Sequence, residues 1–173
     1  MDNPTDYKFA QVDVQAEIEQ VFDDSSLPGD ENPVLLMIAG PIAAGKTTLR
    51  RRHYTHGYVV VDAAEIFLSL CNNRVFEFPP TVFRDELDII GMNIAERAIR
   101  ERRNIVTEVL LGEVISLLSD AMKFHNYQTE VVWVNCDLME AKRRNERRGF
   151  DSISVYYTEQ YHVRWLMQAC RTV

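Results

Sequence analysis

The chain alternates short apolar runs with longer segments in which apolar residues recur every three or four positions. The runs at 34–39, 58–61, 104–108 and 129–135 have the length and composition of strands that are buried in a sheet. Segments with helical spacing connect them, most clearly over 83–98. Because strands that alternate with helices form βαβ units, we expect an α/β fold with a parallel sheet of about four strands flanked by helices.

The same periodicity predicts the other helices, and turn residues separate them. The segment FEFPP, within residues 72–80, is expected to be irregular. An Asp137–Glu140 capping pair is expected to open one of the later helices. Beyond 83–98, helices are predicted at 14–22, from the end of a Gly-rich loop to about residue 55, and at 63–70, 112–125, 137–148 and 157–169.

The first 32 residues differ from the rest of the chain in charge. Residues 1–31 carry nine acidic residues against one lysine, and the segment ends in the turn-rich sequence SSLPGDENP. We therefore expect two parts: an acidic N-terminal extension over 1–32, with a short amphipathic helix that packs on the main body, and a main domain over 33–173.

The composition narrows the class of protein. No apolar run reaches the ~18 residues of a membrane helix, and the start MDNPTDYKFAQ is unlike a signal peptide. The three cysteines are scattered along the chain, which favours reduced thiols over disulfides. We therefore expect a cytoplasmic protein that contacts no membrane.

The charge pattern bears on the ligand. A net charge of −7 argues against general nucleic-acid binding, so no nucleic-acid partner is expected. Basic residues nevertheless cluster at 50–52, 100–103 and 142–148. Local basic clusters on an acidic protein are suited to a small anionic ligand in a cleft. The alternative is that each cluster is a solvated helix face, which we favour for 100–103.

A Gly-rich loop follows the first predicted strand. Residues 40–47 match G-x-x-x-x-G-K-[ST], the P-loop pattern, in the strand-to-helix context that this motif requires. Its backbone N–H groups and lysine bind phosphates, and its hydroxyl residue binds Mg²⁺. We therefore expect a three-layer P-loop NTPase or kinase fold that uses ATP and Mg²⁺. The predicted nucleotide-binding residues are Gly40, Ala43, Ala44, Gly45, Lys46, Thr47 and Thr48, with Lys46 also catalytic and Thr47 the metal ligand.

Residues after the loop indicate which class of P-loop protein this is. A GTPase should carry N-K-x-D, which is absent, and motor or chaperone ATPases usually end the third strand with an acidic pair. Here one carboxylate, Glu108, ends that strand. A kinase needs a base beside the acceptor hydroxyl, and Asp62 ends the second strand, where the ligand crevice of such sheets lies. Asp62 could instead cap the 63–70 helix, and Glu65 is the alternative base.

Further candidates surround this predicted crevice. Glu108 follows three strand residues, where a carboxylate is costly without a function, so we expect it to position substrate or water-bound Mg²⁺. Guanidinium groups suit phosphate oxygens, and Arg144 and Arg148 are the predicted catalytic arginines of the 137–148 helix. That helix could instead be a solvated lid whose arginines pair with its own glutamates. Arg84 is predicted to reach a substrate anion, and Arg164 is a further candidate.

Four segments resemble the zeta-toxin group of P-loop kinases and, more weakly, chloramphenicol phosphotransferase. They are GPIAAGKTT (40–48), VVVDAAEIF (59–67), NIVTE (104–108) and VVWVNCDLMEAKRRNERR (131–148). The resemblance implies transfer of the ATP γ-phosphate to a sugar hydroxyl of a UDP-amino-sugar. It places the base at Asp62, nucleotide binding at Lys46 and Thr47 and substrate contact at Glu108, with lid charge from two arginines of 131–148. It also suggests an antitoxin-like protein partner.

The sequence thus predicts an ATP- and Mg²⁺-dependent kinase that phosphorylates a hydroxyl of a sugar, a nucleotide-sugar or a similar small molecule. Two alternatives stay open. One is a nucleoside, nucleotide or antibiotic kinase on the same scaffold. The other is a nucleotide-binding protein without kinase activity that docks a partner, for which the acidic N-terminal helix offers a surface.

Overall fold

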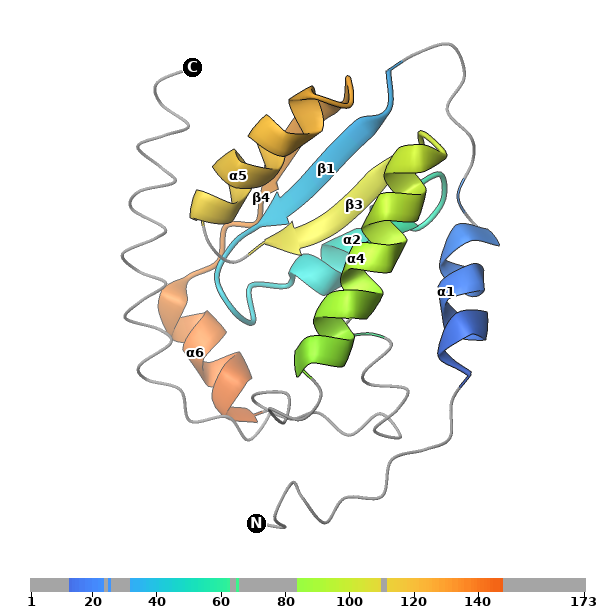
Figure 1. Ribbon diagram of the computed structural model, residues 1–173. Helices are drawn as coiled ribbons and strands as arrows, with labels where there is room; N and C mark the ends of the chain where they lie inside the picture. Colours follow the sequence, from blue (N-terminus) through green and yellow to red (C-terminus); the bar gives the residue numbers. More distant parts are fainter. Residues whose placement is uncertain are drawn as a thin grey trace.

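A computed structural model of the chain describes residues 13–23, 25, 32–62, 65, 84–109 and 112–147. These residues form a parallel four-stranded sheet with helices on both faces (Figure 1). The strands are β1 (Val34–Ala39), β2 (Val59–Val60), β3 (Ile105–Val109) and β4 (Gln128–Trp133), in the spatial order β2-β3-β1-β4. The predicted α/β architecture with a parallel sheet is therefore confirmed.

Strand β1 lies in the interior of the sheet because it pairs with β3 on one side and with β4 on the other. Each residue from Leu35 to Ala39 is at most 2% exposed. A strand that is covered on both faces has no need of polar alternation, which explains its continuous apolar sequence. The register sets Ile38 opposite Glu108 and Ala39 opposite Val109, so the ends of β1 and β3 coincide.

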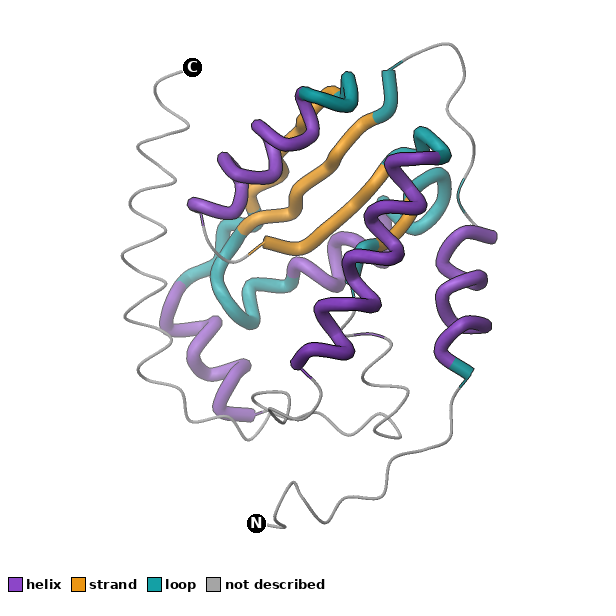
Figure 2. The backbone as a smooth tube through the Cα atoms, in the orientation of Figure 1, coloured by secondary structure: helices purple, strands orange, loops and turns teal. Residues whose placement is uncertain are grey.

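The two faces of the sheet are covered by different helices (Figure 2). On one face, Leu35 and Met37 pack in a cluster with residues of α1 (Val14–Asp23), α4 (Arg84–Arg100) and α5 (Gly112–Lys123). On the other face, Leu36 and Ile38 pack with Leu49 of α2 (Lys46–His53). The predicted amphipathic helix of the N-terminal segment is thus α1, and Ile18 and Phe22 anchor it in the first cluster.

The predicted elements and the observed ones differ mainly at their ends. β2 is shorter than the predicted strand 58–61, because only Val59 and Val60 are in register with β3. The Val61 N–H makes one further bond to β3, to the Val106 carbonyl oxygen at 3.0 Å. α2 ends at His53, and α6 (Leu138–Arg147) and the other described helices match their predicted segments to within a few residues. The helix predicted at 157–169 lies outside the described residues, as does most of the one predicted at 63–70.

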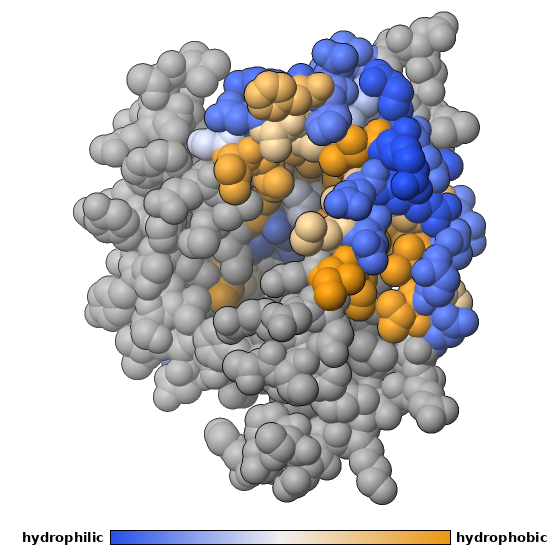
Figure 3. All heavy atoms as spheres, in the orientation of Figure 1, coloured by the Kyte–Doolittle hydropathy of each residue, from blue (hydrophilic) through white to orange (hydrophobic). Residues whose placement is uncertain are grey.

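Apolar side chains also reach the surface over the α4–α5 face (Figure 3). Ile89 and Met92 of α4 are 57% and 60% exposed, and Leu117 of α5 is 70% exposed. In the part of the chain that the structure describes, no helix has the length and apolar character needed to span a membrane.

A buried tyrosine hydrogen-bonds to two neighbouring segments at the end of the sheet that lies away from the P-loop. Tyr127 is 6% exposed, and its hydroxyl shares its one proton between the carbonyl oxygens of Arg103 (2.8 Å) and Ala98 (3.2 Å). It thereby links the segment before β4 to the end of α4 and the start of β3. Burial raises the pKa of the Tyr127 phenol to about 12, so the hydroxyl keeps its proton at all physiological pH values.

Replacing Tyr127 by phenylalanine should lower the free energy of unfolding by about 1–2 kcal/mol, because a buried hydrogen bond is lost while the ring is kept. Urea unfolding followed by circular dichroism measures this change. The matched control is Phe124→Leu in the same turn, since Phe124 is 87% exposed. Equal stability of Tyr127→Phe and the unaltered protein would show that the hydroxyl makes no net contribution.

Candidate active site

The carboxyl ends of β1, β3 and β2 meet at one edge of the sheet. The loop from β1 to α2 (Figure 1) begins at Gly40, β3 carries Glu108 next to its end, and Asp62 follows β2 after Val61. Side chains two residues apart in a strand point to the same face of the sheet. Val106 and Val60 lie on the face that α2 covers, so Glu108 and Asp62, each two residues later, lie on that face as well. Both carboxylates therefore lie on the side of the sheet from which α2 emerges.

The loop over 40–45 has a backbone that only a few residue types adopt easily. Gly40, Ala43 and Gly45 have φ values of 153°, 57° and 104°, and the Ala44 N–H donates to the carbonyl oxygen of Pro41 at 3.2 Å. A Cβ on Gly40 would stand 2.8 Å from the carbonyl oxygen of Val134, which follows β4. Glycine at this position therefore allows the loop to lie directly against the end of β4.

Lys46 begins α2 and turns back across the loop. It is 7% exposed, and its Nζ donates to the carbonyl oxygens of Gly40 and Pro41, each at 2.9 Å. These bonds hold the ammonium group within the curve of the loop. The N-terminal N–H groups of α2 begin at the same place, so a fixed positive charge and a helix N-terminus converge on one point, as phosphate binding requires.

Thr47 and Glu108 meet where α2 passes the end of β3. The Thr47 hydroxyl donates to Oε2 of Glu108 at 2.8 Å. A hydroxyl that donates its proton keeps lone pairs that can bind a cation, and a carboxylate is a ligand that Mg²⁺ prefers. Among the described residues no three His, Cys, Asp or Glu side chains form a metal site. The pair therefore fits a Mg²⁺ ion that takes its remaining ligands from phosphates and water.

Arg50 lies at the centre of the acidic groups and was not among the predicted site residues. Its guanidinium is 1% exposed; Nε donates to Oε1 of Glu108 at 2.8 Å, and Nη2 donates to Oε1 of Glu65 at 2.6 Å and to Oδ2 of Asp62 at 3.2 Å. The side chains of Asp62, Glu65 and Glu108 keep 20%, 34% and 16% exposure. The predicted base, the alternative base and the predicted substrate contact thus belong to one network.

The electrostatics of this network favour the charged forms. Burial alone would lower the pKa of Arg50, but the hydrogen bonds to Glu108 and Glu65 outweigh it and raise that pKa. Burial would raise the pKa of Glu65, and the bonds and charges of Arg50 and Arg51 lower it instead. Arg50 and Glu65 are therefore each stabilised in the ionised state by the opposite charges that they contact.

Arg144 approaches the loop from α6. The Asp137 carboxylate accepts the Glu140 N–H at 3.0 Å, which confirms the predicted cap and fixes the start of the helix. Nη1 of Arg144 lies 3.5 Å from the Ala43 carbonyl oxygen and 4.0 Å from the position of a Cβ on Gly45. Its Nε donates to Glu140 at 3.0 Å. Arg144 is 43% exposed and so stands over the loop with its guanidinium accessible.

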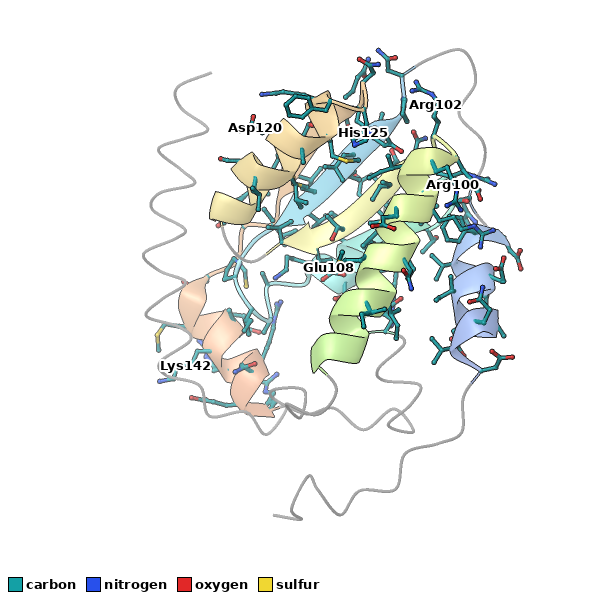
Figure 4. All side chains as sticks on the ribbon, in the orientation of Figure 1. Arg100, Arg102, Glu108, Asp120, His125 and Lys142 are labelled. Atoms are coloured by element: carbon teal, nitrogen blue, oxygen red, sulfur yellow. The ribbon has the colours of Figure 1, made fainter. Side chains whose placement is uncertain are left out.

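The remaining arginines divide between the described and undescribed parts of the chain. Arg148 and Arg164 lie outside the described residues, and only the backbone of Arg84, the first residue of α4, is described. Arg100 and Arg102 are exposed and lie at the end of the sheet opposite Glu108 (Figure 4). This position agrees with the interpretation of the 100–103 cluster as a solvated surface for these two residues, whereas Arg103 is 17% exposed and its Nη1 donates to the Ser25 carbonyl oxygen at 2.7 Å.

A sequence signal for Arg50 exists, although it is weak. Arg50 follows Thr47 by three residues, so both lie on the same face of the helix that leaves the loop. A cation on that face, directly opposite a strand-end carboxylate, is suited to an ion pair. The run Arg50–Arg52 hides this signal, because Arg51 and Arg52 are exposed and only Arg50 is buried.

Residues 35–170 match the model of a protein family described as AAA domain. The chain belongs to this family. The matched range contains the loop, both carboxylate-bearing strand ends and α6. A search of curated protein sequences found no match.

Solved structures with the same fold include chains from the following three systems. A chain of the PezAT chromosomal toxin–antitoxin system of Streptococcus pneumoniae matches with a TM-score of 0.61 and 13% identity, over 87% of this chain and 63% of that one. The AvrRxo1-ORF1:AvrRxo1-ORF2 complex with sulphate ions matches with a TM-score of 0.64 and 16% identity, over 90% and 58%. The Pnkp1/Rnl/Hen1 RNA repair complex matches with a TM-score of 0.63 and 13% identity, over 82% and 47%.

These identities are low, so the matches establish the fold alone. They confirm the predicted resemblance to zeta-toxin-like P-loop kinases at that level. The chain spans between 47% and 63% of the length of the matched chains.

Replacing Gly40 by alanine should weaken ATP binding by about tenfold or more, because the new Cβ forces the loop away from Val134 at a cost of ~1–3 kcal/mol. Isothermal titration calorimetry with ATP measures the effect. The matched control is Ala43→Gly, since Ala43 already has φ 57° and glycine adopts that value without strain. If the two variants bind ATP equally, the contact with β4 does not shape the loop.

Proposed function

We propose that the protein is an ATP-dependent phosphotransferase that phosphorylates a hydroxyl group of a small molecule. The observation that carries this proposal is the contact chain from Thr47 through Glu108 and Arg50 to Asp62, which sets a carboxylate beside the P-loop. A carboxylate at the end of β2, in addition to the groups that bind nucleotide, is what a kinase needs beside the acceptor hydroxyl. We further propose a sugar or nucleotide-sugar, such as a UDP-amino-sugar, as the acceptor, on the resemblance to the zeta-toxin group.

Each side chain has a defined part in such a transfer. Asp62 accepts the proton of the acceptor hydroxyl, whose oxygen forms a bond to the γ-phosphorus while the bond from that phosphorus to the ADP oxygen breaks. Lys46 binds the β- and γ-phosphate oxygens from within the loop. Arg144 contributes positive charge from α6, where developing charge on the moving phosphoryl group needs it.

Mg²⁺, when bound with ATP, neutralises phosphate charge and orients the γ-phosphate. Thr47 and Glu108 are the residues that would hold it, directly or through water. The Glu108 carboxylate also orients the Thr47 hydroxyl, because it accepts a hydrogen bond from that group and leaves the oxygen lone pairs on the other side. Arg84 and Arg148 keep their predicted roles as substrate and phosphate contacts within this proposal.

A second candidate function is a nucleotide-binding module that docks a protein partner. Exposed apolar side chains on α4 and α5 favour it, since contiguous apolar surface often marks an interface. Two of the matched structures come from a toxin–antitoxin system and a two-protein complex. We therefore propose a protein partner, of the antitoxin kind, alongside the kinase activity, and we propose that the acidic segment 1–32, whose helix α1 packs on the main domain, carries its contact.

Replacing Asp62 by asparagine should lower kcat by roughly 10²–10⁴-fold, because the group that accepts the hydroxyl proton is lost. The KM for ATP should change far less than kcat, by less than about tenfold, since Asp62 reaches the nucleotide loop only indirectly, through Arg50 and Glu108. ADP release is measured with a panel of neutral sugars, amino sugars, UDP-amino-sugars, nucleosides and antibiotics as acceptors. Asp120→Asn on α5 is the matched control, because Asp120 is 71% exposed and lies away from the loop.

An acceptor that stimulates ADP release in the control, but not in Asp62→Asn, identifies the substrate class. The kinase proposal is wrong if no acceptor stimulates ADP release, or if Asp62→Asn releases ADP as fast as the control. The partner-docking module would then be the better account.

A further inference from the structure

One cation of the P-loop helix contacts every described carboxylate of the site. Arg50 is in the second turn of α2, and its hydrogen bonds reach Glu108 near the end of β3, Asp62 just after β2, and Glu65 three residues beyond Asp62. Burial of a guanidinium is costly unless charge and hydrogen bonds compensate it. Here three carboxylates provide the opposite charge and the hydrogen bonds. The position of each carboxylate therefore depends on the Arg50 side chain.

Arg50 differs from the cations that are placed to bind phosphate. Only 1% of its side chain is exposed, against 43% for Arg144. Its Nε and Nη2 already donate to carboxylate oxygens within 3.2 Å. Arg50 therefore has no accessible surface for a nucleotide or an acceptor, and its part in the site is to position other groups.

Glu108 connects Arg50 to the nucleotide loop. Its Oε1 accepts from Arg50 Nε at 2.8 Å and its Oε2 accepts from the Thr47 hydroxyl at 2.8 Å. A change in how strongly Arg50 attracts Glu108 alters the negative charge that the carboxylate presents to Thr47. The two ends of the site, Thr47 and Asp62, do not need to touch in order to influence each other.

We propose that Arg50 is a positioning residue that couples nucleotide binding at Thr47 and Glu108 to the placement of the acceptor-side carboxylates Asp62 and Glu65. This role rests on the proposed function, because the proposed function assigns Thr47 and Glu108 to the binding of Mg²⁺ and nucleotide. When Asp62 loses its charge, Arg50 is drawn toward Glu108, and the nucleotide end loses part of its negative charge.

Lysine cannot replace arginine in this role. A guanidinium presents a rigid fork of N–H groups that serves three acceptors at once, whereas an ammonium is a point charge on a flexible stem. Arg50→Lys therefore keeps the charge and removes the geometry. Arg52→Lys is the matched control, because Arg52 belongs to the same helix and is exposed.

A double-mutant cycle on Mg·ATP binding tests the coupling without any acceptor. In the protein with Arg50, Asp62→Asn should raise the Kd for Mg·ATP by about threefold or more. In the Arg50→Lys background, the same substitution should raise this Kd by less than about 1.5-fold. The direct effect of removing the Asp62 charge is the same in both backgrounds, because lysine keeps the cation. The Arg52→Lys background should behave as the unaltered protein does.

Calorimetry gives each Kd, and thermal unfolding shows whether each variant is folded. If Arg50→Lys does not fold, the comparison of Asp62→Asn with Asp120→Asn decides: a higher Kd for Asp62→Asn supports the coupling, and equal values overturn it. Equal shifts in the Arg50 and Arg50→Lys backgrounds also overturn it.

The outcomes separate this role from the kinase activity. If the cycle shows coupling but no acceptor receives phosphate, the positioning role stands and the kinase proposal is rejected. Transfer that is lost in Asp62→Asn, together with equal shifts in the cycle, keeps the kinase and rejects the positioning role. Failure of the unaltered protein to bind Mg·ATP overturns both.

Discussion

The site depends on a positive charge that the fold takes almost completely out of water. The Arg50 guanidinium is 1% exposed, and removal of a cation from water is costly unless opposite charges and hydrogen bonds replace its hydration. Three carboxylates meet this need, and they come from two strand ends and the segment after β2. Because all three must reach one guanidinium, the ends of β2 and β3 and the P-loop helix are held in a fixed relation.

The strand order makes this convergence possible. β3 lies between β1 and β2, so the end of β3 separates the nucleotide loop from the proposed base by one strand. Alternation of side chains along β3 places Val106 in the core on the α2 face and Glu108 two residues later at its rim. The face of the sheet that α2 covers is therefore apolar in its interior and charged at the carboxyl ends of the strands. Membership of the AAA domain family explains why the chain has the nucleotide loop and the parallel sheet. The charged edge is the feature on which the proposed phosphate transfer depends.

Local patterns were sufficient to predict much of this molecule. The apolar run Val34–Ala39 predicted β1, the P-loop pattern predicted the strand–loop–helix unit, and Asp137 predicted the start of α6. The length of β2 could not be predicted, because it depends on which residues find partners on β3. The role of Arg50 was missed for the same reason: its acceptors are 12, 15 and 58 residues away, and no local periodicity relates them.

The central claim is that this edge transfers the γ-phosphate of ATP to a small molecule. The most direct measurement follows the label of γ-labelled ATP after incubation with the protein and a metabolite extract. The account predicts a labelled product that is neither ATP nor inorganic phosphate, and no such product with Lys46→Met, which removes the charge within the loop. Label that stays in ATP, or that is released only as inorganic phosphate, would contradict the account.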